Sequence, residues 1–368
     1  MLKKIICGML IFAALLSLMA CGGKYAPVPS TEEEERVVMT FEFEGEKYEM
    51  RYELYRAFFL TYKSRVDKGD SSVWTGENKD KYIAEIDSII INSAADIFSA
   101  FHIAKKIGKN PFSVSVDKQI ENLIEASVEG GVTDSGVIEG FGGDYDAYLA
   151  SLREYYINYS VSTLLMRYSI AYSEIVNYYK GNIYEEELDE EIKIGELSFT
   201  EEDVRAFYDG DNSVRVLMAT LDARSFTAER ARQIRDTISG YASETGVKNY
   251  IISFTATTAE DGLDGMLIGR NSLDEAYFAE ITEAAFALSA GETSEVIYIS
   301  SQASENYYIL YKTDKTEEFY QNNKTDIYSV FADNEIGKII KDAKDGIIKS
   351  AAHSKILNSL ERDKIDMD

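Results

Sequence analysis

Apolar residues recur at three- and four-residue steps in much of the chain, which is the spacing of an amphipathic helix. One series ends before the break at Gly108–Pro111 and consists of Ile83, Ile86, Ile90, Ala94, Ile97, Phe101, Ala104 and Ile107. Another lies beyond Lys315 and consists of Ile327, Phe331, Ile336, Ile339, Ile340, Ile347, Ile348 and Ile356. A third long helix is expected from about residue 145 to Tyr179. Both ends of the chain are therefore predicted to be mostly helical.

Alternation of apolar and polar residues predicts the strands. From Val38 it predicts a short hairpin that turns at Glu44-Gly45-Glu46. In the middle of the chain the pattern predicts a strand at Val214–Leu221, a helix at Ala228–Thr245, a helical stretch within Asp274–Leu288, and closing strands at Val296–Ile299 and Tyr307–Lys312. This order indicates an α+β domain with an antiparallel sheet flanked by helices.

The length of 368 residues exceeds what one hydrophobic core usually organises, so two domains are expected. The apolar C-terminal helix needs a docking partner, and the N-terminal helices are the obvious one, which makes the middle domain an insertion. The fold class is therefore expected to be α+β. Its expected parts are a signal peptide at 1–20, a tether at 21–37, an N-terminal helical domain at 38–212, the inserted domain at 213–314, and a C-terminal helix at 315–368 that returns to the helical domain.

The N-terminus has the composition of a bacterial secretory signal. Lys3 and Lys4 precede an uncharged run from Ile5 to Ala20, which is too short and too terminal for an ordinary membrane-spanning helix. The segment Leu18-Met19-Ala20-Cys21-Gly22 resembles a lipobox. That resemblance implies that Cys21 is acylated, becomes the mature N-terminus and holds the protein on the extracytoplasmic face of the cell membrane. The alternative is an ordinary signal peptide that ends near a cysteine.

Charge and cysteine content exclude several kinds of function. The formal net charge of −26 argues against binding to nucleic acid, and the acidic surface is expected to keep the body soluble and away from anionic lipid. Cys7 lies in the expected signal peptide and Cys21 would be acylated, so the folded body has no disulfide, no thiol nucleophile and no cysteine–zinc site. The sequence has no P-loop or dinucleotide fingerprint, and no cofactor or metal is expected.

Two further segments carry a family resemblance. Gly140-Phe-Gly-Gly-Asp-Tyr-Asp-Ala-Tyr-Leu resembles part of the N-terminal module of exported foldases of the PrsA and SurA type. The stretch from Ile281 to Ile297 reads as an amphipathic helix, a glycine turn and a strand start, an order that resembles the late part of a parvulin-type (PpiC-type) peptidyl-prolyl isomerase domain. The second resemblance extends from Val214 to Lys312.

The parvulin resemblance also indicates a pocket. In that family two histidines on central strands adjoin an apolar floor of Met, Phe and Leu. Placed on this pattern, Met218 and Tyr308 occupy the positions of the two histidines, while Tyr277, Ile281 and Leu267 occupy those of Met, Phe and Leu. The chain has two histidines, His102 and His353, and both lie outside this segment in stretches expected to be helical. The resemblance therefore implies a parvulin-like fold with weak or absent isomerase activity, and no catalytic residue is assigned.

The expected function follows from these resemblances. They imply a membrane-anchored extracytoplasmic chaperone that binds unfolded or newly exported polypeptides, with the parvulin-like domain as a binding or spacing module. The alternatives are an active prolyl isomerase, in which Tyr308 and neighbouring polar residues replace the histidines, and a non-catalytic surface scaffold or binding lipoprotein. Many tyrosines between residues 145 and 179 suit either a binding surface or half-buried packing in a helical bundle.

Overall fold

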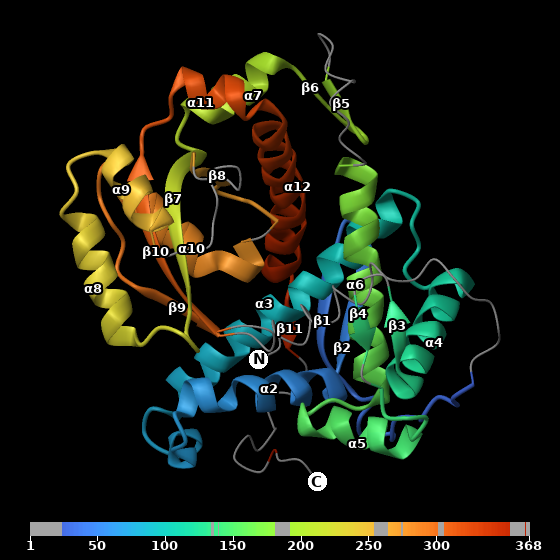
Figure 1. The fold of residues 1–368 in the computed structure, drawn as a ribbon. Helices are drawn as coiled ribbons and strands as arrows, with labels where there is room; N and C mark the ends of the chain where they lie inside the picture. The colour runs from blue at the N-terminus through green and yellow to red at the C-terminus, as the bar shows by residue number, and fades with distance from the viewer. Residues whose placement is uncertain are drawn as a thin grey trace. The chain divides into compact units, whose positions relative to one another are not determined.

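The computed structural model describes residues 24–133, 136–138, 140–180, 192–253, 264–273, 275–300, 305–353 and 365 (Figure 1). The expected signal peptide, Cys21 and the first residues of the expected tether lie outside the described residues. The chain divides into two compact units, of which unit 1 comprises Met1–Ile175 and Ile340–Asp368, and unit 2 comprises Val176–Ile339. Helices and small antiparallel sheets make up the fold, which confirms the predicted α+β class.

The sheet of unit 1 joins residues from both ends of the chain. Strands β1 (Val37–Phe43) and β2 (Glu46–Arg51) form the predicted hairpin, whose turn places Glu44 and Gly45 at φ of 48° and 81°. Strand β11 (Ala352–His353) pairs with β1, with Met39 opposite His353. His353 thus lies in a strand rather than in the expected helix. The order β11-β1-β2 leaves β2 as an edge strand of this sheet among the described residues.

Helices make up most of unit 1. They are α2 (Tyr52–Asp67), the short 3-10 helix η1 (Ser71–Trp74), α3 (Lys79–Lys106), α4 (Val114–Glu129), α5 (Tyr145–Glu154) and the first part of α6 (Tyr159–Lys180), with a small hairpin of β3 (Gly131–Thr133) and β4 (Gly136–Ile138) after α4. Helix α3 buries Ile86, Ile90, Ile97 and Phe101, as its spacing predicts. Among the described residues α3 is also the one helix long and apolar enough to cross a membrane. Of its most apolar 18-residue segment, 67% is buried inside the protein.

Two of the predicted helices are interrupted. The stretch from residue 145 to Tyr179 breaks between α5 and α6, where Tyr156 takes φ of 63° and the Asn158 side chain accepts a hydrogen bond from the backbone N–H of Val161 at 2.9 Å. The stretch Ala228–Thr245 divides into α8 (Ala228–Ser239) and α9 (Glu244–Ile252). The Ser243 hydroxyl caps the start of α9 by accepting from the backbone N–H of Gly246.

Unit 2 contains a four-stranded antiparallel sheet in the order β8-β7-β10-β9. Its strands are β7 (Ser213–Asp222), β8 (Met266–Gly269), β9 (Ile297–Ser300) and β10 (Glu305–Thr313). Leu217, Ala219 and Ile309 pack on one face with α8 and α9. Val216, Ile268 and Leu310 pack on the other face with α10 (Glu275–Ala287). The predicted strand–helix order therefore forms a sheet with helices on both faces.

A second core extends unit 2 beyond the expected boundaries of 213–314. It is formed by the hairpin of β5 (Ile192–Ile194) and β6 (Leu197–Phe199), by α7 (Glu201–Asp209) and α11 (Glu317–Asn322), and by the first part of α12 (Lys324–Lys349). Tyr208 of α7 packs against Phe319 and Tyr320 of α11 in this core, so α7 and α11 belong to unit 2. The ion pair between Lys180 Nζ and Asp333 Oδ1, at 2.8 Å, joins the beginning and the end of the unit.

Helix α12 contains two glycines at close contacts. A Cβ at Gly337 would lie 1.6 Å from the backbone oxygen of Asn271, within unit 2. A Cβ at Gly346 would lie 2.1 Å from Cε2 of Phe43, within unit 1. Because no other residue lacks a Cβ, glycine is required at both positions for these contacts to form.

Candidate functional site

Three of the five parvulin-pocket positions lie together in unit 2. Met218 on β7 is opposite Leu310 on β10, and Tyr308 lies two residues before Leu310, so all three share one face of the sheet. Ile281 packs on this face from α10. Tyr308 is 8% exposed and Ile281 is 3% exposed. These positions therefore form part of a packed apolar cluster between the sheet and a helix.

The other two positions are not brought into this cluster. Leu267 is opposite Arg215 on β7, on the other face of the sheet, and it belongs to the core formed by α7, α11 and α12. Tyr277 lies on α10, and its side chain is outside the described residues. The predicted pocket is thus assembled in part, without Leu267.

Tyr308 brings a polar group to the described part of this cluster. The Tyr308 hydroxyl accepts a hydrogen bond from Asn306 Nδ2 at 3.3 Å. Both histidines belong to unit 1. His102 is buried, with Nδ1 3.1 Å from the Tyr48 hydroxyl and Nε2 3.2 Å from Glu44. These contacts give His102 a structural role in the packing of α3 against the β1–β2 hairpin.

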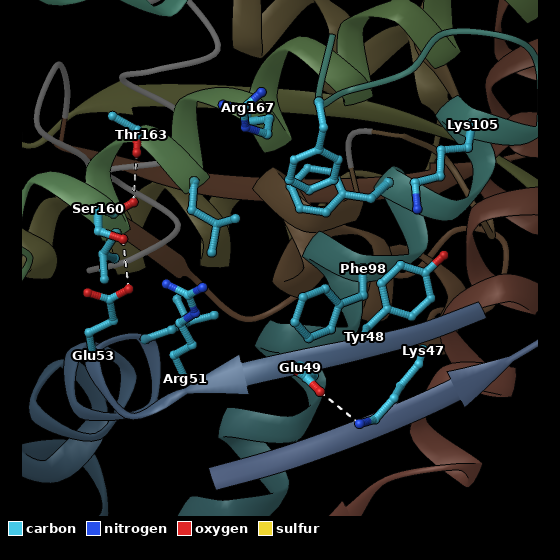
Figure 2. Close-up of a pocket in the computed structure, with 15 residues that line it drawn as sticks. Lys47, Tyr48, Glu49, Arg51, Glu53, Phe98, Lys105, Ser160, Thr163 and Arg167 are labelled. Carbon is cyan, nitrogen blue, oxygen red and sulfur yellow. Dashed lines mark hydrogen bonds and ion pairs between the residues drawn. The ribbon is translucent and has the colours of Figure 1, made fainter. Parts of the chain in front are cut away.

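A groove in unit 1 is a second candidate site, which the sequence did not predict. It has a volume of about 420 Å³ and lies between β2, α3 and α6 (Figure 2). Its apolar lining comes from Tyr48, Leu54, Phe98, Phe101, Phe112, Val161 and Leu164, and its polar lining from Lys47, Glu49, Arg51, Glu53, Lys105, Ser160, Thr163 and Arg167. Figure 2 shows Tyr48 and Phe98 beside each other over β2.

Aromatic rings dominate the apolar part of the groove. Tyr48 stacks on Phe98 with ring centroids 5.4 Å apart, and Phe101 meets Phe112 edge-on at 5.1 Å. Phe112 lies just before α4 and is 51% exposed, although it contacts the fully buried Phe101. The guanidinium of Arg167 lies 5.0 Å from the Phe112 ring centroid, within the range of a cation–π contact. The groove therefore presents a half-exposed ring held by its neighbours.

The charged groups around the groove are paired. Lys105 Nζ lies 2.8 Å from Glu46, Arg167 lies 2.7 Å from Asp117, and Lys47 lies 2.7 Å from Glu49. Burial raises the pKa of the Tyr48 hydroxyl, and its hydrogen bond to Glu46 raises that pKa further. Tyr48 consequently stays neutral over the physiological pH range, and the lining combines neutral rings with compensated charges.

The edge strand gives the groove a second means of contact. Lys47, Tyr48, Glu49 and Arg51 of β2 all line it, so it follows this strand along its length. An edge strand has backbone N–H and C=O groups without strand partners, to which an extended peptide can add.

The lining of the groove comes from segments around residues 47–54, 98–112 and 160–167. The alternation in β2 and the helical spacing in α3 were visible in the sequence, but their meeting with α6 was not.

Comparisons with known proteins identify similar structures but no family. No family model and no curated protein matches the chain. The foldase protein PrsA of Streptococcus pneumoniae is 14% identical over 87% of this chain and 93% of that chain, with a TM-score of 0.23. PrsA of Bacillus subtilis is 15% identical over 74% and 87%, with a TM-score of 0.22. PrsA of Lactococcus lactis is 14% identical over 89% and 98%, with a TM-score of 0.24. The chain is thus similar to solved PrsA foldase structures over most of its length.

Proposed function

We propose that the protein is a membrane-anchored extracytoplasmic chaperone that binds extended segments of unfolded or newly exported polypeptides. The observation that carries the proposal is the groove of unit 1, in which the half-exposed Phe112 ring and a buried aromatic floor adjoin an edge strand. Acylation of Cys21 would supply the membrane anchor. Unit 2 would serve as a binding or spacing module with weak or no isomerase activity.

The groove suits clients of varied sequence. Hydrogen bonds from the backbone of β2 would be the same for every client segment, because each peptide unit offers one N–H and one C=O. Phe112 would contact an apolar side chain of that segment, supported from below by the buried Phe101 ring. Aromatic rings provide much contact area with little loss of rotamer freedom. Paired charges on the lining leave no unmatched charge for an apolar client to bury.

Replacing Phe112 with serine is expected to weaken client binding about tenfold, in the range of a central aromatic contact at an interface. The substitution removes the most exposed ring of the groove and leaves α3 and α6 unchanged. The measurement is the affinity for a permanently unfolded, fluorescently labelled protein, together with suppression of aggregation of a reduced model protein.

The matched control is Tyr298→Ser. Tyr298 is 52% exposed, almost the same as Phe112, but it lies on β9 in unit 2. Because Tyr298 lies outside the groove, the Tyr298→Ser variant should retain the original affinity for the unfolded protein. Equal losses in the two variants, or no suppression of aggregation by the unchanged protein at stoichiometric excess, would contradict the proposal.

The isomerase proposal leads to a separate expected result. In a protease-coupled assay on a proline tetrapeptide, the protein should give a rate indistinguishable from that of buffer, because Met218, Ile281 and Tyr308 fill the expected catalytic region with apolar contacts. A known prolyl isomerase added to the same mixture should accelerate the reaction and so exclude inhibition. Acceleration proportional to protein concentration that disappears in Tyr308→Phe, which removes only a hydroxyl, would instead establish an active enzyme.

A further inference from the structure

The expected tether is docked from Lys24 onward. Its polar, proline-containing composition predicts a free linker, yet residues 24–36 make side-chain and backbone contacts with unit 1 at several points. Pro27 and Pro29 fix two of its backbone φ angles, which further limits its freedom. The segment therefore behaves as a part of unit 1.

The first end of the segment is held by α4 and α5. The Tyr25 ring stacks on Tyr145 with centroids 4.9 Å apart and an interplanar angle of 29°. Both the Tyr25 hydroxyl and the Lys24 ammonium group donate to the carboxylate of Glu129. The Tyr145 hydroxyl donates to the backbone oxygen of Ala26 at 2.9 Å. Three polar contacts and one ring stack thus fix the first three described residues.

The second end is held at the start of α2 and α6. The Ser30 hydroxyl donates to Glu53 at 2.5 Å. Asn158 Nδ2 donates to both Glu34 and Glu53, at 3.1 and 3.0 Å. The backbone N–H of Glu53 donates to the backbone oxygen of Glu34 at 3.1 Å. Since Glu53 is a buried residue, these hydrogen bonds attach the second end of the segment to the interior of unit 1 and not only to its surface.

An exposed ring lies beside the first end. Phe141 is 39% exposed and meets Tyr148 edge-on at 5.9 Å, while Tyr148 in turn stacks with Tyr145 at 6.0 Å. The Phe141 loop is fixed, because its backbone N–H donates to the Val128 oxygen at 2.8 Å. Gly142 and Gly143 follow at φ of 61° and 86°, where a side chain would be strained. Phe141 and the Tyr25–Tyr145 stack therefore belong to one aromatic cluster.

The short connection to Cys21 gives this docking a consequence. Three residue steps separate Cys21 from Lys24, and even a fully extended chain spans only about 10 Å over that number of residues. An acyl group on Cys21 must lie in the bilayer. The docked end of unit 1 would then be held close to the lipid headgroups, whatever the movement of the connecting residues.

We propose that residues 24–36 form a docked stalk that holds the Tyr25–Tyr145 end of unit 1 against the outer surface of a phospholipid bilayer. The proposal rests on the proposed acylation of Cys21. Exposed apolar side chains, phenylalanine among them, bury at the boundary between headgroups and acyl chains, which makes Phe141 the ring best placed to enter it. Asp144 and Asp146 are exposed beside this cluster, so the surface suits zwitterionic rather than anionic headgroups.

Energy transfer to labelled lipid tests the orientation. Cys7 and Cys21 are the only cysteines of the chain, so an acylated mature protein can carry one fluorophore at an introduced cysteine. Asp146→Cys places it on α5, and Glu77→Cys places it between η1 and α3; both remove one exposed acid. In Figure 1 the blue turn that follows α2 lies away from α4 and α5. On phosphatidylcholine vesicles with an acceptor on the headgroups, transfer should be at least twofold more efficient from position 146.

Two further variants separate docking from anchoring. Replacing Lys24 and Tyr25 together with serine should bring the two efficiencies close together. Ten Gly and Ser residues inserted between Gly23 and Lys24 should lower transfer from position 146, because such a linker adds a root-mean-square span of about 17 Å. In a flotation experiment, a protein that does not rise with the vesicles through a density gradient would overturn both the acyl anchor and the docked stalk. Equal transfer from the two positions in a protein that floats fully would overturn the stalk alone.

Discussion

Replacing Arg215 with methionine is expected to lower the free energy of unfolding by about 2–3 kcal/mol, near the lower end of the cost of removing one partner from a buried ion pair. The Arg215 side chain is 4% exposed on β7. It binds Glu244 at 2.7 Å and the backbone oxygens of Asp264 and Asp314 at 3.0 and 2.8 Å, and it lies 4.3 Å from the Phe319 ring centroid. One guanidinium thus joins α9, the segment before β8, the end of β10 and α11.

The estimate is at the low end because Glu244 keeps other partners. Thr313 and Lys248 also bind its carboxylate, and its side chain is 29% exposed. Burial acts to raise the pKa of Glu244, but these hydrogen bonds and the charge of Arg215 hold it below its usual value. The measurement is chemical denaturation followed by circular dichroism.

Arg224→Met is the matched control, because Arg224 is an exposed arginine paired with Asp222. That variant should unfold at nearly the original denaturant concentration, since exposed ion pairs contribute little. The interpretation fails if the two arginine variants unfold at the same midpoint.

Gly337→Ala is expected to lower the free energy of unfolding by about 1–3 kcal/mol, the usual cost of overpacking. Alanine is intrinsically better than glycine within a helix by about 1 kcal/mol, so local propensity alone predicts the opposite sign. The contact with the Asn271 backbone determines the outcome, because α12 and the segment after β8 would have to separate. Calorimetry or chemical denaturation measures the change.

Two variants on the same helix serve as comparisons. Gly346→Ala should cost less than Gly337→Ala, because the Phe43 ring can move more easily than a backbone carbonyl. Asp342→Ala changes an exposed residue of α12 and should leave stability the same or slightly higher. A gain in stability from Gly337→Ala would show that the close contact does not exist in solution.

Periodicity predicted the helices and strands more reliably than their ends. The structure has the helix predicted from the spacing in α3 and the strand predicted from the alternation in β1, and burial extends to more than one face of each, at Ile97–Ala104 and at Val38 and Met39. The break at Tyr156 depends on a positive φ in a residue that rarely adopts one, and no pattern in the sequence indicates it. The boundary of unit 2 likewise depends on packing between α7 and α11, which are more than a hundred residues apart.

The candidate sites show why side-chain positions were harder to predict. Met218 and Tyr308 lie on one face because β7 and β10 pair in register over eight residues. Leu267 lies on the other face because it is opposite Arg215, and successive residues of a strand point to opposite faces. The docked segment was missed because the partners of its polar groups, Glu53, Glu129 and Asn158, are far away in the sequence.

The pairing of β1 with β11 determines the order in which the two units can be completed during synthesis. Met39 pairs with His353, so the sheet of unit 1 cannot close until nearly the whole chain has emerged, whereas every residue of unit 2 is present by Ile339. The Lys180–Asp333 ion pair holds the two ends of unit 2 together once it has folded. Folding of unit 2 would thereby shorten the effective loop between β1 and β11 and reduce the entropy lost when they pair. A chain that stops before Ala352 would have every residue of unit 2, but its unit 1 would lack strand β11.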